Sequence, residues 1–365
     1  MKSFIKQHKI LTTILIIFLS LFLLAGIAFG FMMFKLNKLT YHDGKLSSQE
    51  TVALPIEDDD TLKEAFAVTE EPHVETENLI SDAEAEPLGQ SEVVHSEVEI
   101  IYDENIFNLL LLGTDERVNK FATNARADSI MLLSLDKEKK TMKLVSLQRG
   151  MGVPIPYGLY EGQYDWLTHL FRYGGADMML QAVRDNLNVD VQYYVRVNFH
   201  TFEKLIDSVG GVDIDLAEAE VNALNGGTNK KTMVSPFHVG ANHLNGYNAL
   251  KYVRLRRIDS DWKRVQRQRN VIQSVVKAAG DMSLLDINAM LDTVLPLIQT
   301  NLTTTDILGL VGYAPAVLGC DFEQMTIPAK GTFGTMKGMG NRNLYAVDFQ
   351  QNSKILQEFL YGMEE

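Results

Sequence analysis

The chain contains 25 consecutive residues, Ile10–Phe34, without a charged side chain. A helix needs about 20 apolar residues to cross a bilayer, so this stretch predicts a transmembrane helix preceded by a short tail, residues 1–9. A cleavable signal peptide is the alternative, but its apolar core usually covers only about 7–15 residues, and an Ala-x-Ala cleavage site is poorly matched here. Three lysines lie on each side of the stretch, and His8 with the α-amino group favours a cytoplasmic N-terminus.

An acidic segment follows the apolar stretch. Residues 43–99 hold 17 acidic residues and two lysines, a net charge of −15 in a chain whose total is −13. Three prolines, few aromatic residues and no apolar periodicity make the segment too polar to bury a core, and self-repulsion extends it. We therefore predict a linker over residues 35–99, and the chain's acidity indicates nothing about the folded part.

Residues 100–365 are long enough for one sizeable domain. The chain has one cysteine, Cys320, which excludes an intrachain disulfide. Cys320 is interpreted as a small buried apolar residue rather than a nucleophile, because no histidine-rich neighbourhood is apparent in the sequence.

Strand-like and helix-like segments alternate through this domain. Short apolar or β-branched runs predict strands at 106–112, 129–135, 142–147, 191–197, 212–216 and 324–328. Helical spacing predicts helices at 175–187, 199–209, 247–255, 261–279, 283–299 and 305–318. The alternation favours an α/β domain, a three-layer α/β/α arrangement around a central mixed sheet.

Six arginines and one lysine are concentrated between Tyr252 and Asn270. Arginine suits phosphate groups, because its planar guanidinium stays charged and donates paired hydrogen bonds. If Asp261 caps a helix, Arg264, Arg267 and Gln268 share one of its faces. Arg254 and Arg256 lie just upstream. A solvated basic helix face is the alternative interpretation of this segment alone.

Charged residues also lie at the ends of predicted strands, where α/β folds place their sites. Asp115 follows the first strand and Asp128 precedes the second. Because adjacent strands bring such ends together, the two carboxylates can hold one hard cation, and Mg²⁺ is the natural choice beside phosphate. A turn or cap residue is the alternative for each aspartate. Arg149 ends the third strand.

Eight blocks in this order resemble the LytR-CpsA-Psr family between about Phe107 and Val276. They read Leu-Leu-Leu-Gly-Thr-Asp-x-Arg, Arg-x-Asp-Ser-Ile-Met-Leu, Leu-Val-Ser-Leu-x-Arg, Tyr-Gly-Gly, Tyr-Tyr-Val-Arg-Val-x-Phe, Gly-Gly-Val-Asp-Ile-Asp, Leu-Asn-Gly-x-x-Ala-Leu-x-Tyr-Val-Arg-x-Arg and Asp-Ser-Asp-x-x-Arg-x-x-Arg-Gln. A membrane anchor ahead of the domain fits the same family.

The resemblance implies an extracytoplasmic phosphotransferase of Gram-positive bacteria. Such an enzyme attaches an anionic glycopolymer, of the teichoic acid or capsular type, from a polyprenyl-pyrophosphate donor to peptidoglycan. It implies Asp115 and Asp128 as ligands of Mg²⁺, with Arg149 beside them as the third catalytic residue. It assigns the pyrophosphate to Arg126, Arg149, Arg254, Arg256, Arg264 and Gln268, and the shared helix face adds Arg267. Arginines and magnesium stabilise the charge of a leaving pyrophosphate without a covalent intermediate.

A lipid donor also requires an apolar tunnel. Five residues on a strand and the following helix are candidates for its lining: Tyr193, Val195, Phe199, Phe202 and Ile206. Ordinary core packing is the alternative.

Three positions depart from the family's pattern. Gly150 replaces an aspartate after Arg149, where the family usually has Pro-Arg-Asp, and Trp166 and Thr168 replace a lysine and an asparagine. The alternative functions are a non-catalytic envelope scaffold that binds polyprenyl pyrophosphate, which Gly150 would favour, and a transcriptional regulator. The regulator is disfavoured, and no nucleic-acid partner is expected, because only nine residues precede the membrane span.

Overall fold

The structure is a computed structural model that describes residues 33–46, 91–116, 121–122, 124–226, 237–256, 258–311, 313 and 322–362. Residues 10–32 of the predicted span, most of the predicted linker and Cys320 lie outside these ranges. Within them, no helix combines the length and the apolar character that crossing a membrane requires.

A mixed seven-stranded sheet forms the centre of the domain, in the order β1-β10-β7-β2-β3-β4-β11. The strands are β1 (Thr40–Tyr41), β2 (Ile106–Thr114), β3 (Ala127–Asp136), β4 (Thr141–Leu147), β7 (Tyr193–Val197), β10 (Gln299–Thr300) and β11 (Glu323–Ile327). β2, β3 and β4 form an antiparallel meander, whereas β7 and β11 add in parallel to its two sides. The predictions of a mixed α/β fold and of these main strands are confirmed.

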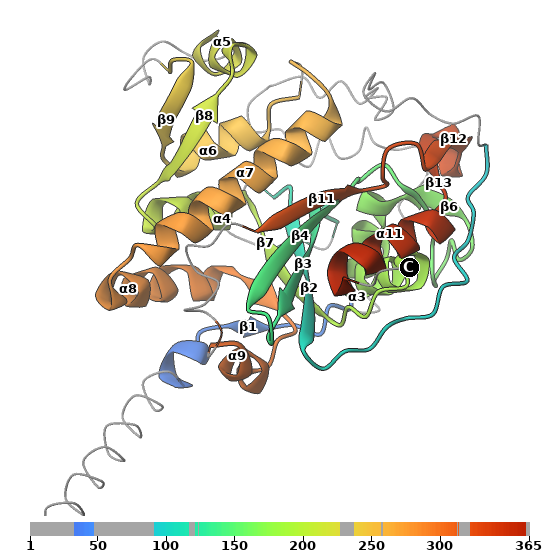
Figure 1. Cartoon of the computed structure of the whole chain (residues 1–365), viewed down its shortest axis with the longest axis horizontal. Coiled ribbons are helices and arrows are strands. Elements are labelled where there is room, and N and C mark those ends of the chain that lie inside the picture. Colours follow the sequence, from blue (N-terminus) through green and yellow to red (C-terminus); the bar gives the residue numbers. More distant parts are fainter. Residues whose placement is uncertain are drawn as a thin grey trace, which may run out of the picture.

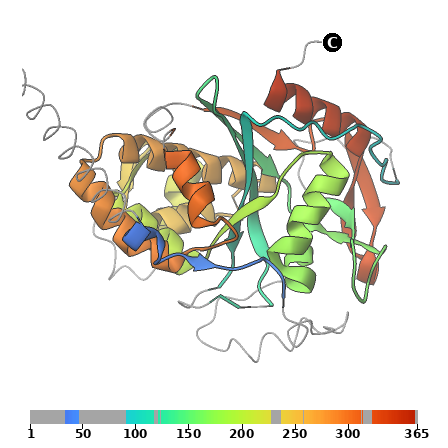
Figure 2. The ribbon, with the colours of Figure 1, turned by 90° about the horizontal axis from the view of Figure 1, so that it is seen from below.

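Helices cover both faces of the sheet (Figures 1 and 2). α3 (Leu167–Leu187) and α11 (Phe349–Tyr361) lie on one face. On the other lie α4 (Phe199–Ser208), α6 (Gly246–Val253), α7 (Asp261–Gly280), α8 (Leu284–Val294) and α9 (Thr304–Val311). α5 (Glu218–Gly226) packs beside α6, and the hairpin of β8 (Val212–Leu216) with β9 (Gly240–Leu244) packs against α7.

The two faces of the sheet are packed differently. Leu110, Leu112 and Leu132 point toward α3 and are at most 1% exposed. Their strand neighbours Leu111 and Leu133 point toward Ile272 and Val276 of α7 but are only partly buried. Because successive side chains of a strand alternate between faces, the apolar runs supply both layers.

Several helix boundaries differ from the sequence predictions. α3 begins eight residues before the predicted Gly175, because its first two turns are buried almost all round and show little amphipathic periodicity. Gly175 interrupts this helix with a φ of 71°. The helix predicted over 283–299 ends at Val294, and a 3₁₀ turn at Leu295–Leu297 contains Pro296, which cannot donate a helical hydrogen bond.

Other small elements were not predicted. β5 (Gly152–Pro154) pairs with β6 (Tyr164–Trp166), and β12 (Phe333–Lys337) pairs with β13 (Asn343–Val347); a short 3₁₀ turn, Met339–Asn341, connects the latter pair. Residues 35–46, which the sequence placed at the start of the linker, instead pack on the domain and supply β1. The folded part therefore begins before the acidic segment.

Candidate active site

Three strand ends and the start of one helix meet at the predicted site. Asp115 follows β2, Asp128 is the second residue of β3, Arg149 follows β4, and Asp261 is the first residue of α7. The register of β2 and β3 shifts between Gly113 and Thr114, and a bulge of this kind redirects the side chains that follow. The structure thereby brings together the two aspartates and the arginine that the sequence predicted for the site.

Asp128 is paired with two arginines. Its Oδ1 accepts a hydrogen bond from Nη1 of Arg149 at 3.1 Å, and its Oδ2 accepts one from Nη2 of Arg256 at 2.9 Å. Burial disfavours the carboxylate charge, but Arg149 and Arg256 outweigh this effect and hold the pKa of Asp128 well below its usual range. Asp128 is therefore ionised at neutral pH.

A second carboxylate, Asp261, is shared by two arginines. Its Oδ1 lies 3.2 Å from Nη2 of Arg149 and 2.9 Å from Nη2 of Arg264. The same Arg264 nitrogen also donates to the backbone carbonyl of Asp128 at 3.3 Å. Burial and the neighbouring charge of Arg149 lower the pKa of Arg264 to about 10, which leaves it charged at neutral pH.

The cap of α7 is Ser260 and not Asp261, which corrects the sequence interpretation. The Oγ of Ser260 accepts a hydrogen bond from the backbone N–H of Lys263 at 3.2 Å. A serine at this position satisfies a helix N-terminus as well as an aspartate does. The Asp261 carboxylate is consequently available to the arginines.

Asp115 lies beside the Asp128 cluster and pairs with Arg126. Its Oδ1 accepts from the backbone N–H of Arg126 at 3.0 Å, and its Oδ2 accepts from Nε at 3.2 Å. Burial and the nearby charge of Asp128 nevertheless raise the pKa of Asp115. Two carboxylates that disfavour one another's ionisation form an environment that a divalent cation stabilises. In the described ranges, this site included, no three His, Cys, Asp or Glu side chains gather to hold a metal ion, so the site offers a pair of carboxylates.

The predicted arginines differ in their access to solvent. Arg149 and Arg264 are buried, with 8% and 2% of their side chains exposed. Arg126 and Arg256 are partly exposed, and Arg254 is exposed, with its guanidinium 4.4 Å from the ring centre of Phe199. A ligand can reach the outer three directly, while the inner two lie behind Asp128 and Asp261.

Gln268 and Arg267 have different surroundings. Gln268 accepts a hydrogen bond from Ser129, the residue after Asp128, at 3.0 Å, which places it at the edge of the cluster. Arg267 points elsewhere. It binds Asp259 through two hydrogen bonds of 2.6 and 2.7 Å, and it also contacts Glu220 at 3.3 Å and the carbonyl of Leu255 at 2.8 Å. The structure thus places Arg267 in a separate buried ion-pair network, contrary to the shared helix face that the sequence suggested.

Two of the five predicted tunnel residues, Tyr193 and Val195, lie on the strand β7 of the central sheet. Tyr193 and Val195 pair with Leu109 and Leu111 of β2, and the Tyr193 hydroxyl donates to Asp306 of α9 at 3.3 Å. Tyr193, Val195, Phe199 and Phe202 are all partly buried. Ile206 is completely buried in a cluster with the β8–β9 hairpin, so core packing describes it better, and Phe199 and Phe202 pack against the same cluster.

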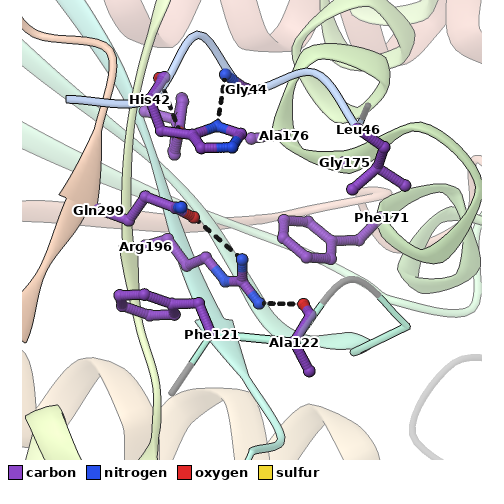
Figure 3. Close-up of a pocket in the computed structure, with 11 residues that line it drawn as sticks. His42, Gly44, Leu46, Phe121, Ala122, Phe171, Gly175, Ala176, Arg196 and Gln299 are labelled. Atoms are coloured by element: carbon purple, nitrogen blue, oxygen red, sulfur yellow. Dashed lines mark hydrogen bonds between the residues drawn. The ribbon is translucent and has the colours of Figure 1, made fainter. Parts of the chain in front are cut away.

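A cavity of about 220 Å³ lies at the other side of β7 (Figure 3). Arg196 of β7 projects between Phe121 and Phe171, with its guanidinium carbon 4.6 and 4.5 Å from the two ring centres. It donates to Gln299 at 2.9 Å and to the Ala122 carbonyl at 2.8 Å, and it pairs with Glu116. Because Glu116 adjoins Asp115, Arg196 ties the end of β2 to β7.

The three departures from the family's pattern lie near the cluster. The carbonyl of Gly150 accepts a hydrogen bond from Tyr345 N at 3.0 Å. Thr168 donates to the carbonyl of Ala127 at 2.8 Å, directly behind Asp128. The Trp166 indole instead donates to the backbone carbonyl of Asn343 in β13 at 2.7 Å.

Sequence reasoning missed the roles of Asp261 and Arg196. Arg196 is a charged residue inside the apolar run of β7, and a buried arginine requires an anionic partner, so a search for that partner could have drawn attention to Glu116. Asp261 was noticed, but only as a helix cap. Its role depends on two arginines, one of them from a distant strand, which local spacing does not indicate.

Comparison with known proteins places this geometry in context. A model of the LytR_cpsA_psr family matches residues 73–359. The polyisoprenyl-teichoic acid–peptidoglycan teichoic acid transferase TagT of Bacillus subtilis (strain 168) is 31% identical over 225 residues, which cover 60% of this chain and 67% of that protein. TagU of Bacillus cereus (strain ATCC 14579), a transferase with the same description, is 35% identical over 210 residues, covering 57% and 64%. The chain thus spans about two thirds of the length of these relatives.

Solved structures show the same fold. A structure of TagT bound to LIIa-WTA is 26% identical, with a TM-score of 0.57, over 78% of this chain and 98% of that chain. The structure of TagT bound to LI-WTA is 27% identical, with a TM-score of 0.55, over 74% of this chain and all of that one.

Proposed function

Because the chain belongs to the LytR-CpsA-Psr family, we propose that it is a transferase that attaches an anionic glycopolymer to peptidoglycan. The observation that carries the proposal is the pairing of Asp128 with Arg149 and Arg256, beside Asp115. The arginines supply the positive charge that a pyrophosphate needs, and the carboxylates supply the oxygen ligands of a metal. The donor in this proposal is a polyprenyl-pyrophosphate-linked polymer of the teichoic acid or capsular type.

The proposed reaction exchanges one phosphorus–oxygen bond for another. A hydroxyl oxygen of peptidoglycan forms a bond to the phosphorus that carries the glycan, and the bond from this phosphorus to the polyprenyl phosphate breaks. The hydroxyl proton is released, and polyprenyl phosphate leaves. Arg254, Arg256 and Arg126 face the pyrophosphate directly, while Arg149 and Arg264 fix the carboxylates behind it and add to the positive potential. Arg267 is left out of this site because its partners lie elsewhere.

Asp115 and Asp128 fit a magnesium ion. Mg²⁺ is usually held by one or two carboxylates, together with waters and substrate phosphates, so the pair is a sufficient protein contribution. Burial and the nearby charge of Asp128 raise the pKa of Asp115, and a cation between the two carboxylates would stabilise its ionised form. The ion, when bound, would supply further charge neutralisation at the pyrophosphate. Asp115 and Asp128 would hold the ion next to the arginines.

The lipid of the donor is proposed to lie between the sheet and α7. Leu111, Leu133, Tyr193 and Val195 on that face are only partly buried, although a helix layer covers them. The ring of Phe199, two residues after β7, lies 4.4 Å from the guanidinium of Arg254, which connects this region with the arginine cluster. An isoprenoid chain is apolar and can occupy such a hollow.

We further propose that Ile10–Phe34 crosses the membrane once, with the transferase domain outside the cell. A polyprenyl donor stays in the membrane, and peptidoglycan lies beyond it, so the site must face the outer surface. The uncharged length of the stretch supports this placement.

Replacing Arg256 by alanine tests the function. We expect donor binding to weaken by about tenfold or more, because a charge-assisted hydrogen bond contributes roughly 1.5–3 kcal/mol. The assay follows transfer from a lipid-pyrophosphate-linked glycan to peptidoglycan oligomers in the presence of magnesium, with donor affinity measured separately. Arg254→Ala is expected to act similarly, whereas Lys263→Ala, an exposed position of α7, serves as the control. Unchanged affinity in both arginine variants would refute the proposed pyrophosphate site.

Replacing Gly150 by aspartate separates a transferase from a scaffold. Arg149 already pairs with Asp128 and Asp261, so a third carboxylate adds little, and we expect the transfer rate to change only a few-fold. The φ of Gly150 is not positive, so an aspartate there does not strain the backbone. If the parent makes no product with several donors while the aspartate variant does, the parent is a degenerate member that binds donor without turnover.

A further inference from the structure

The segment just after the predicted membrane span packs on the transferase domain. β1 pairs in parallel with β10, with Thr40 beside Gln299 and Tyr41 beside Thr300. The backbone N–H of His42 extends the pairing with a 2.8 Å hydrogen bond to the carbonyl of Thr300. We call residues 35–46 the docked segment, since it forms an edge of the central sheet (Figure 2).

Ion pairs hold the first part of the docked segment. Lys35 and Lys38 both bind the carboxylate of Asp292 on α8, Lys38 with an Nζ–Oδ1 distance of 2.5 Å. Lys35 is 6% exposed and Leu36 is 7% exposed, so this turn is covered by the domain. Hydrogen bonds from the two lysines lower the pKa of Asp292, which keeps its charge at neutral pH.

A close backbone contact holds the other end. The carbonyl of Gly44 accepts a hydrogen bond from the backbone N–H of Asp177 at 3.0 Å. A Cβ atom at Gly175 would lie 2.5 Å from the same carbonyl oxygen, and one at Gly44 would lie 3.0 Å from the Asp177 nitrogen. Both glycines also have positive φ angles, of 71° and 86°. This approach therefore requires glycine on both sides.

The docked segment also closes the Arg196 cavity. His42, Gly44 and Leu46 line one side of it, opposite Phe121 and Ala122 (Figure 3). The Tyr194 hydroxyl donates to the carbonyl of His42 at 3.0 Å. The segment is thus integrated with β7, which carries Arg196.

We propose that the docked segment holds the β1 edge of the domain against the outer face of the cytoplasmic membrane. This proposal rests on the membrane span of the proposed function. Phe34 ends the span, and the seven residues to Tyr41 reach at most about 25 Å. A flexible linker of about 65 residues would instead allow separations of about 45 Å. Tyr41 is 60% exposed, and tyrosine suits a membrane–water interface. The partner is a lipid surface, held against one defined edge of the sheet.

The test uses the full chain in vesicles of phosphatidylcholine and phosphatidylglycerol. A carbodiimide joins an amine to a carboxylate in contact, so it should cross-link Lys38 to Asp292, as mass spectrometry can verify. A bimane label on the domain itself, at the exposed Thr305→Cys of α9 in a Cys320→Ser background, should be quenched by lipids that carry a headgroup spin label, because α9 follows β10 beside β1. A label at Val239→Cys should not be, because Figure 1 places the β8–β9 hairpin at the opposite end of the molecule from β1.

Gly44→Val is the undocking variant. We expect about tenfold less cross-link, a ratio that corresponds to about 1.4 kcal/mol, and loss of quenching at position 305, because only the linker then connects the domain to the span. Gly158→Val is the matched control, since Gly158 has a φ of 95° but no atom within 4 Å of an added Cβ. Asp292→Ala is a second undocking variant, scored by quenching alone, in case Gly44→Val folds poorly.

Each result decides a separate point. Absence of the cross-link in the parent overturns the docking. A cross-link without quenching at position 305, in a protein that resists alkaline extraction from the vesicles, overturns the contact of the β1 edge with the membrane and leaves the anchored transferase intact. Extraction of the protein at alkaline pH overturns both the contact of the β1 edge with the membrane and the proposed span. Transfer activity is measured in parallel, so failure of the transferase proposal is recognised independently.

Discussion

Asp128→Asn is expected to lower the rate of magnesium-dependent transfer by about a thousandfold, while donor binding is retained or strengthened. Removing one preorganised electrostatic group from an active site costs about 10²–10³ in rate, and Asp128 has two such roles. It is a proposed metal ligand, and it positions Arg149 and Arg256. Because the substitution removes a carboxylate that competes with the pyrophosphate for the same arginines, binding and turnover should change in opposite directions.

Single-turnover transfer and donor affinity, measured over a range of magnesium concentrations, separate the two effects. Asp213→Asn is the control, because this carboxylate is exposed and pairs with His243 of the β8–β9 hairpin. An Asp128→Asn protein with the magnesium response and rate of the parent would exclude Asp128 from the metal site. Asp115→Asn should show the same loss of magnesium response, since Asp115 is the second proposed ligand.

Arg267→Ala is expected to destabilise the domain by about 3–5 kcal/mol, the usual cost of removing one partner of a buried ion pair. Arg267 is 2% exposed, and its removal leaves Asp259 and Glu220 without their cation. At about 2–4 °C per kcal/mol for a domain of this size, the melting temperature should fall by roughly 6–20 °C. Calorimetry or thermal circular dichroism measures the change.

Lys263→Ala is the neighbouring control and should leave the melting temperature within about a degree or two, as expected for a surface substitution. Any Arg267→Ala protein that remains folded at low temperature should bind donor normally. An unchanged melting temperature combined with weakened donor binding would instead restore Arg267 to the pyrophosphate site, where its spacing from Arg264 first placed it.

The sequence predicted the centre of the fold and much of the candidate site, because both depend on local patterns. Uninterrupted apolar runs mark β2, β3 and β4, and charged residues at their ends must converge when the strands pair. Asp115, Asp128 and Arg149 meet for this reason. The family resemblance also assigned Arg264 of α7 to this site, where it pairs with Asp261.

Features that depend on contacts between distant residues could not be predicted. β1 consists of two residues, and it is a strand only because β10 lies beside it, more than 250 positions later. Arg264 and Arg267 are three residues apart on one helix, yet they belong to different ion-pair networks. Arg264 pairs with Asp261, and Arg267 pairs with Asp259. The first turns of α3 escaped detection because a helix buried all round shows no polar face.

The sharing of Asp261 by Arg149 and Arg264 has a consequence for selectivity. Outside a bacterial cell, the domain would be surrounded by polyanionic wall polymers, and bare arginines would attract any of them. Here the inner guanidiniums already face carboxylates, so a single phosphate gains little by approaching them. Only a ligand that brings two adjacent phosphates, with or without a metal ion, offers enough negative charge to replace the internal anions. The carboxylates thus compete with external anions for the arginines, and anions of low charge are not bound.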